Sequence, residues 1–334
     1  MTAVAAAWQA LRAERRSEAG WHLRQLHPGA PCQIFAAIHQ PDDRPGLIVE
    51  ADATALGAAA QVPKSAGFRV EAGLLGHSHH GRVRIILSLA HAAYAQVFAI
   101  LCADAVDMVT AQKDDRSAIG ALISRLHVWQ AFMARHGPDG LSEAAMIGLM
   151  GELLVLRDHL EPLIGIARAL ETWAGPRGEP NDFSLAGGFL EIKATTRQAP
   201  DRLSISNADQ LDIGRGPILL GHVRFRETPD GETLPDMVDA IKTILAADAP
   251  SALPMYAAAL LAAGYVDAHR QLYDMALLSA AFDLFEITPD FPHLARAELR
   301  RGIIDCSYMI DLAACRPWTV PANALASFAG SFDG

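Results

Sequence analysis

Residues 181–193 read NDFSLAGGFLEIK, and this short stretch predicts an acid and a base on one face of a β-strand. A strand is expected over residues 189–196, where successive side chains point to opposite faces of the sheet. Glu191 and Lys193 therefore share one face. The residues that alternate with them are apolar, so the other face can pack against a core helix.

The residues just upstream predict a hairpin that brings a second acid to the same face. Residues 182–185 are the expected partner strand, and Gly187-Gly188 is the expected two-residue loop. In this register Asp182 lies opposite Lys193, and directly opposed residues point to the same side of a sheet. A three-residue loop would instead place Asp182 opposite Ile192, on the wrong face, so the convergence depends on the loop length.

A helix expected over residues 142–160, with Ser142 as its N-cap, contributes a further acid. Glu152 lies at helical spacing within an apolar stripe, so its carboxylate points toward the core side. The stripe consists of Leu149, Leu153, Leu156 and Leu160. A carboxylate there is costly unless it is paired or bound to a cation. Gly148 and Gly151 remove bulk beside it and permit close approach of the sheet.

This set of residues predicts a site for a hard divalent cation, because Mg²⁺ prefers oxygen ligands. We expect Asp182 and Glu191 to hold one ion together with the backbone carbonyl of Ile192, with Mn²⁺ as the alternative metal. Such an ion polarises a phosphodiester and lowers the pKa of a bound water. Lys193 is expected to orient that water or offset charge in the transition state, and Glu152 to bind a second ion or position the water.

The order Glu152, then Asn181-Asp182, then Glu191-Ile192-Lys193 resembles the signature of the PD-(D/E)XK nuclease superfamily. Asn181 separates Pro180 from the aspartate, so the proline of the signature is matched inexactly. The wider pattern is similar to a bacterial family that carries this motif and was formerly a domain of unknown function. The segments that carry the wider resemblance are residues 148–153 (GLMGEL), 173–176 (WAGP), 182–183 (DF), 191–196 (EIKATT) and 206–211 (SNADQL).

The superfamily resemblance implies an α/β (α+β) fold with a restriction-endonuclease-like core, in which helices flank a mixed sheet. It also implies that Gln210 is similar to an active-site glutamine of several branches; the alternative is an ordinary polar group on a helix surface. The bacterial family implies a setting near restriction, modification or phage-defence genes. Arg197 and Arg202, just past the strand, are expected either to touch phosphates or to be ordinary loop charges.

Three parts are expected along the chain: a β-rich N-terminal domain over residues 1–115, the nuclease core with its preceding helix over residues 116–234, and a mainly helical C-terminal segment over residues 235–334. The chain begins with an alanine-rich helical stretch, and residues 31–110 look strand-rich. The expected strands there are residues 32–39, 47–51, 68–75 and 82–89. The C-terminal segment is expected to contain helices over residues 235–247 and 253–263 and strands near residues 273–287 and 303–312.

Composition limits the function classes. The net charge of −10 argues against broad, charge-driven binding of nucleic acid, although a local basic groove is compatible with it. No apolar run is expected to span a membrane, because the richest one, Ile85 to Val109, is interrupted by polar residues. Without a secretion signal or CxxC spacing, we expect a cytoplasmic protein with reduced cysteines. The histidines of residues 77–80 are expected in a solvated hairpin loop rather than a metal site.

The sequence thus predicts a Mg²⁺-dependent endonuclease that hydrolyses DNA, with RNA as an open alternative substrate and no membrane partner. One nuclease site cuts one strand, so an enzyme that cuts duplex DNA is expected to be a homodimer. The acidic charge keeps a second hypothesis open. In that hypothesis the chain is a non-catalytic subunit that binds nucleic acid or protein within a defence complex, together with partner proteins of the defence system.

Overall fold

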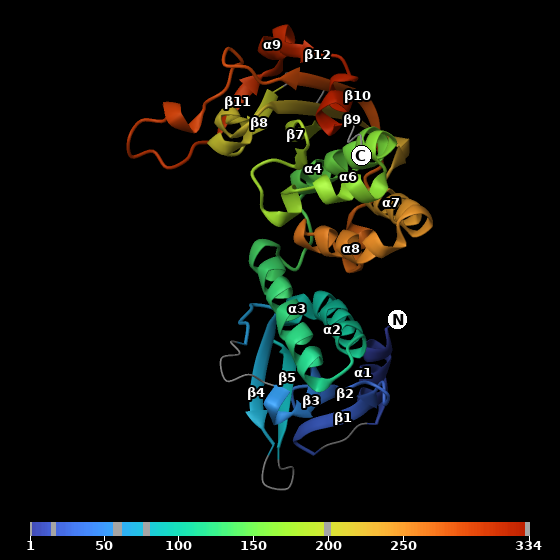
Figure 1. Cartoon of the computed structure of the whole chain (residues 1–334). Coiled ribbons are helices and arrows are strands. Elements are labelled where there is room, and N and C mark those ends of the chain that lie inside the picture. Colours follow the sequence, from blue (N-terminus) through green and yellow to red (C-terminus); the bar gives the residue numbers. More distant parts are fainter. Residues whose placement is uncertain (1, 15–17, 56–61, 76–80, 197–201, 331–334) are drawn as a thin grey trace. The chain divides into compact units, whose positions relative to one another are not determined.

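Two units make up the chain, residues 1–140 and residues 141–334. The computed structural model describes residues 2–14, 18–55, 62–75, 81–196 and 202–330 (Figure 1). The expectations for the histidines of residues 77–80 and for Arg197 lie outside the described residues.

The first unit contains a five-stranded antiparallel sheet in the order β1-β2-β3-β5-β4. Its strands are β1 (Gly20–Leu26), β2 (Gln33–Gln40), β3 (Arg44–Asp52), β4 (Phe68–Leu74) and β5 (Arg82–Leu89). The sheet is accompanied by α1 (Ala3–Ala13), α2 (Ala95–Thr110) and α3 (Asp115–Arg135). Helix α2 contacts both other helices, and α1 and α3 contact strands. In β5 the buried side chains Val83, Ile85 and Leu87 alternate with less buried ones, as period 2 predicts, whereas the central strand β3 is buried continuously from Pro45 to Ala51.

Helix α2 corrects two expectations from the sequence. The strand-rich region was expected to run to residue 110, but its last part is helical. The segment Ala92–Thr110 is also long and apolar enough, by length and composition alone, to cross a membrane, so the expectation of no such run was wrong. In the structure α2 buries one face against α1 and α3, and Phe98 stacks on Trp8 with ring centroids 5.8 Å apart. These contacts explain the apolar residues of α2, because they form part of the core of the first unit.

The second unit is built on a mixed five-stranded sheet in the order β12-β10-β9-β7-β6. Strands β7 and β9 run parallel, and the other neighbours are antiparallel. The strands are β6 (Phe183–Leu185), β7 (Gly188–Thr195), β9 (Ile218–Glu232), β10 (Leu277–Glu286) and β12 (Thr319–Val320). This α+β architecture confirms the predicted fold class.

Different layers cover the two faces of this sheet. Leu190 and Ile192 of β7 belong to a core that includes residues of α4 (Glu143–Leu154), α6 (Ile166–Thr172) and α7 (Leu234–Asp248). Figure 1 shows these helices together on one side of the sheet. A second core contains Leu220 of β9 together with residues of a separate two-stranded sheet, β8 (Arg202–Ile205) and β11 (Tyr308–Asp311). The remaining helices include α8 (Leu253–Ala262), α9 (Leu312–Cys315) and α10 (Ala324–Ala329).

The division into units differs from the boundaries expected from the sequence. The boundary after residue 115 falls in the first turn of α3, inside the first unit. The boundary after residue 234 falls at the start of α7, inside the second unit. A boundary after residue 234 would separate β9 from β10, although these two strands pair along most of β10. The sheet combines strands from before and after this residue.

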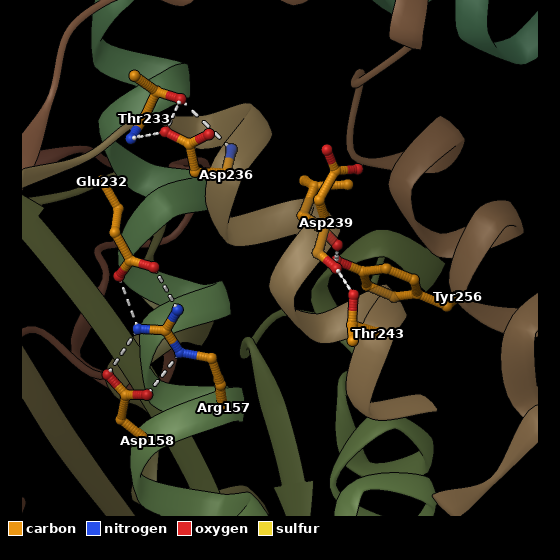
Figure 2. A network of polar contacts seen from close by, with 9 residues as sticks. Arg157, Asp158, Glu232, Thr233, Asp236, Asp239, Thr243 and Tyr256 are labelled. Atoms are coloured by element: carbon orange, nitrogen blue, oxygen red, sulfur yellow. Dashed lines mark hydrogen bonds and ion pairs between the residues drawn. The ribbon is translucent and has the colours of Figure 1, made fainter. Parts of the chain in front are cut away.

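A polar network holds the helix that carries Glu152. The helix is α-helical to Leu154 and continues as a π-helical segment, Val155–Leu160, instead of the uninterrupted α-helix expected. Within this segment Arg157 contacts Glu232 (Nη1 to Oε1, 2.7 Å) and Asp158 (Nε to Oδ1, 2.6 Å), as Figure 2 shows. Glu232 ends β9, and the next residue caps α7, so the network ties three elements together.

Candidate active site

The β6–β7 hairpin brings the predicted acids to one place with a register that differs from the expected one. Leu185 pairs with Gly188, so the loop is Ala186-Gly187 rather than Gly187-Gly188. Continued by one residue, this register puts Asp182 opposite Glu191 and not opposite Lys193. The shift is two residues, which preserves the face of the sheet to which each side chain points.

Gly188 lies in the strand because the chain packs too closely for a side chain there. Its φ is +145°, and a Cβ would lie 2.2 Å from the carbonyl oxygen of Pro217. The same carbonyl accepts a hydrogen bond from the amide of Phe189 at 2.9 Å. Glycine permits both the dihedral angle and the approach, so a contact distant in sequence sets the register.

Asp182 is fixed at the start of β6 by bonds from both sides. Its Oδ2 accepts a hydrogen bond from the backbone amide of Ile192 at 2.7 Å. Its backbone carbonyl accepts bonds from the amides of Ala174 and Gly175 at 2.7 and 3.0 Å. Burial raises the pKa of Asp182 to about 6, although the Ile192 amide and the Lys193 charge oppose the rise. The carboxyl is therefore poised near neutral pH.

Glu152 meets Asp182 around Gly175. A Cβ on Gly175 would lie 3.2 Å from Oδ1 of Asp182 and 3.4 Å from Oε2 of Glu152, so the glycine leaves space beside both carboxylates. The indole Nε1 of Trp173 donates to Oε2 of Glu152 at 2.7 Å. Burial, and next the charge of Asp182, raise the pKa of Glu152 well above its usual range. The indole of Trp173 is thus the hydrogen-bond partner that a carboxyl group within an apolar stripe requires.

The two glycines of the Glu152 helix behave differently. A Cβ on Gly151 would lie 2.6 Å from the Cβ of Ala194, so this glycine permits the close approach of β7 that the sequence predicted. A Cβ on Gly148 would meet nothing within 4 Å, and this residue borders a cavity instead of the sheet. The expectation for Gly148 was therefore wrong, because its side of the helix faces open space.

Glu191 and Lys193 form a buried ion pair beside Gln210. Nζ of Lys193 lies 2.8 Å from Oε1 of Glu191 and donates to Oε1 of Gln210 at 3.0 Å. Glu191 is only 1% exposed. Burial, and then the charge of Asp182, raise the pKa of Glu191 to about 8, while Lys193 and Asn181 oppose the rise. Lys193 therefore contacts both Glu191 and Gln210, the two other residues of this predicted group.

Asn181 and Arg215 complete the surroundings of this ion pair, and neither residue had a predicted role. Nδ2 of Asn181 donates to Oε2 of Glu191 at 3.3 Å and to the backbone carbonyl of Gln210 at 2.7 Å. Its Oδ1 accepts from Nη1 of Arg215 at 2.8 Å. Gln210 lies on the short turn η5 (Ala208–Leu211), so Asn181 ties this turn to the hairpin. Its position next to Asp182 in the motif was the signal that could have identified it.

A cavity of about 570 Å³ opens beside these groups, and Glu152, Asp182 and Gln210 are among its lining residues. Lys193 lines a second cavity of about 510 Å³ together with Arg202 and His222. His222 lies directly beside Lys193, since the two are paired across β7 and β9. Arg202, for which a phosphate contact and an ordinary loop charge were both expected, is the first residue of β8 and lines the same cavity as the lysine.

The donor set around Gly175 fits a hard divalent cation, with a different pair of acids from the expected one. Among the described residues, no group of three or more His, Cys, Asp or Glu side chains is arranged to hold a metal. Glu152 and Asp182 nevertheless line one cavity and approach the open space at Gly175. Glu191 is instead engaged with Lys193. The carbonyl of Ile192 stays a predicted ligand.

A mixed sheet flanked by helices, with an acid and an acid–lysine pair on one hairpin, is the arrangement of the PD-(D/E)XK class. The chain belongs to the family described as "Putative PD-(D/E)XK family member, (DUF4420)", whose model matches residues 4–313. The match spans both units, so the N-terminal sheet is part of the family as well. None of the curated proteins and none of the solved structures compared with the chain matches it.

Proposed function

We propose that this chain is a metal-dependent endonuclease that hydrolyses phosphodiester bonds in DNA. The observation that carries the proposal is the convergence of Asp182, Glu191 and Lys193 from one hairpin beside Glu152. Buried acids with raised pKa values at a cavity, here Glu152 and Asp182, are typical of functional sites rather than of structural ion pairs. Membership of the family supports the same class of activity.

Glu152 and Asp182 are the side chains that would hold Mg²⁺ or Mn²⁺, with Glu191 and the carbonyl of Ile192 as further predicted ligands. Each of the two carboxylates is oriented by a hydrogen bond to one of its oxygens, from Trp173 and from the amide of Ile192. A divalent cation bound there supplies a Lewis acid and lowers the pKa of a bound water. The two hydrogen bonds hold the acids in place before the cation arrives.

Lys193 is the proposed water-orienting or charge-stabilising group. Its ammonium is held between Oε1 of Glu191 and Oε1 of Gln210. A cation fixed in this way can stabilise negative charge on a phosphoryl group without reorganising during the reaction. Gln210 is a positioning residue in this proposal, because its side chain fixes the lysine.

A titration of Mg²⁺ and Mn²⁺ with plasmid DNA, linear DNA and RNA of the same sequence tests the proposal. We expect metal-dependent cleavage of DNA that is lost in Asp182→Asn and Lys193→Met. The control is Glu286→Gln, an exposed acid in the same unit, which should cut like the unmodified protein. Cleavage of RNA alone would contradict the DNA assignment. Absence of cleavage on any DNA, methylated or not, would contradict the enzyme.

A second candidate function is a non-catalytic subunit that binds nucleic acid or protein. Two observations favour it. The net charge is −10. Glu191 is paired with Lys193, and among the described residues no three His, Cys, Asp or Glu side chains are arranged to hold a metal ion. This function predicts thermal stabilisation by Mg²⁺ or by DNA with no product in the cleavage assay. The same titration therefore separates the two candidates.

We also propose a bacterial restriction or phage-defence setting in the cytoplasm. A homodimer is expected if duplex DNA is cut, because each site hydrolyses one strand. Sedimentation of the protein with and without duplex DNA tests this, and a monomer that makes double-strand breaks in one binding event would contradict it.

A further inference from the structure

A turn between β10 and β11 displays two arginines and two isoleucines to solvent. The amide of Ile303 donates to the carbonyl of Arg300 at 2.9 Å, and Gly302 has a φ of +98°, which suits the third position of such a turn. Ile303 is 50% exposed and Ile304 is 83% exposed. We call residues 300–304 the arginine–isoleucine tip. Figure 1 shows the orange-red loop that carries it projecting from the second unit.

The loop that bears the tip is anchored to the turn η5, which carries Gln210. Arg296 makes a bidentate ion pair with Asp209, with both N–O distances 2.6 Å. Nη1 of Arg296 also donates to the carbonyl of Ile304 at 3.0 Å, which fixes the base of the tip. Oδ1 of Asp305 accepts from the amide of Ala208 at 3.1 Å. Two contacts with η5 and one within the loop therefore fix the base of the tip relative to η5, whose Gln210 binds Lys193.

The anchor of the loop that bears the tip lies at the edge of the candidate active site. Asp209, the partner of Arg296, lines the cavity that contains Glu152 and Asp182. A ligand long enough to extend beyond this cavity would pass the loop anchored at its edge. A nucleic-acid duplex is such a ligand, whereas a single nucleotide is not.

The chemistry of the tip favours a duplex over other partners. Arg300 and Arg301 are both exposed and adjacent, so the tip presents two positive charges side by side in a chain whose net charge is −10. Proteins that bend DNA place apolar side chains between base steps and contact the adjacent phosphates with arginine. Large exposed apolar side chains at a protein surface are typical of an interaction site.

We propose that the arginine–isoleucine tip is a wedge for duplex nucleic acid. Arg300 and Arg301 contact phosphates, and Ile303 and Ile304 insert beside or between base pairs of the duplex that extends beyond the cavity. The inference rests on the proposed function in taking DNA as the substrate. It adds the element that would distort the duplex where it extends beyond the cavity.

Binding of a short duplex DNA, measured by fluorescence anisotropy in EDTA and again in Ca²⁺, tests the wedge without requiring cleavage. In Arg300→Ala/Arg301→Ala we expect weaker binding and a shallower salt dependence. Its log–log slope should fall by about 0.9 for each phosphate that the variant no longer neutralises. The control is Arg226→Ala/Lys242→Ala, which removes two exposed cations elsewhere on the unit. This control should bind like the unmodified protein.

The isoleucines are tested in Ile303→Ala/Ile304→Ala with 2-aminopurine placed at successive positions of the duplex. We expect the salt slope to be unchanged, the affinity to fall about tenfold and the fluorescence increase from unstacking to be abolished. The matched control is Leu272→Ala/Leu278→Ala, two leucines that are 57% and 40% exposed.

Three outcomes would overturn the wedge. The tip variants could bind and unstack DNA like their controls, or the unmodified protein could fail to bind duplex in both EDTA and Ca²⁺. The isoleucine variant could also change the sedimentation coefficient of the free protein but not its DNA binding, which would assign the tip to a second copy of the chain. Failure of the nuclease is a separate result, since DNA bound and unstacked through the tip but never cut contradicts only the proposed activity.

Discussion

Both units bury an acid on a β-strand, but the two acids have different surroundings. In the first unit Glu50 is 7% exposed and lies directly opposite Arg84, whose Nη2 is 2.6 Å from Oε1. This is one acid with one base from the neighbouring strand. In the second unit Glu191 pairs with Lys193, but Asp182 and Glu152 raise the number of acids to three around a single lysine. An unbalanced cluster of this kind is what we expect of a functional site, whereas a balanced pair is what we expect of a structural one.

The largest expected effect is on cleavage activity, which should depend on the Glu191–Lys193 pair and not on the Glu50–Arg84 pair. Lys193→Met should lower the single-turnover cleavage rate by about 10²–10³-fold, because charge stabilisation in the transition state is removed. Arg84→Met should leave the rate unchanged and lower the free energy of unfolding by about 1–3 kcal/mol, because Glu50 loses its partner. Quench-flow cleavage and urea unfolding measure the two effects. Equal loss of activity in both variants would end the distinction.

The second prediction concerns pH. The pKa of Glu191 is raised to about 8 in the folded protein, above its usual 4.5, so its contribution to stability is present below pH 4.5 and is lost as pH rises to 8. Asp182, whose pKa is raised to about 6, acts in the same direction. Without metal, the free energy of unfolding should fall across this range by several kcal/mol.

The double variant Asp182→Asn/Glu191→Gln should flatten this pH dependence, and Glu50→Gln should leave its slope unchanged. Urea unfolding in EDTA at a series of pH values measures it. Added Mg²⁺ should restore stability most at the alkaline end, because the cation binds the deprotonated carboxylates. A flat profile in the unmodified protein would mean that the three acids are not mutually destabilising.

A smaller effect is expected from filling the space at Gly175. Gly175→Ala places a methyl group within 3.2 and 3.4 Å of two carboxylate oxygens and should weaken Mn²⁺ binding by about tenfold. Gly148→Ala, in the same cavity but without a contact within 4 Å, should leave the affinity unchanged. Isothermal titration calorimetry with Mn²⁺ compares them. Equal affinities would place the ion away from Gly175.

The smallest effect is expected for Gln210, which acts through the lysine. Gln210→Ala should lower the cleavage rate by about three- to tenfold and leave the Mn²⁺ affinity unchanged, because the side chain orients Lys193 and holds no metal in the proposal. The pH–rate profile should also change, since the environment of the lysine changes. An unaltered profile with a lower rate would assign Gln210 a purely structural role.

The sequence predicted those parts of the site that depend on local pattern. Alternation along residues 189–196 placed Glu191 and Lys193 on one face, and helical spacing placed Glu152 on the core side of its helix. Ser142 accepts a hydrogen bond from the amide of Ala145, as expected of the N-cap. In each of these cases the periodicity of a single element is sufficient.

The parts that the sequence did not predict depend on contacts between distant segments. The hairpin register follows from the approach of Pro217 to Gly188, and the bond from Trp173 to Glu152 joins residues 21 positions apart. The pairing of β9 with β10 crosses the predicted boundary after residue 234. Neither composition nor periodicity contains information about which segments meet in this way.

The contacts between η5 and the C-terminal loop set the order in which parts of the site can form during synthesis of the chain. The β6–β7 hairpin and the turn with Gln210 are complete by Leu211, but Arg296 and Asp305 contact that turn only after roughly 90 further residues have been synthesised. At ribosomal rates this takes about 5–20 s. A nascent chain therefore carries the acids and the lysine well before their support is in place. The finished site is a property of nearly the whole polypeptide, and an interrupted translation product would lack it.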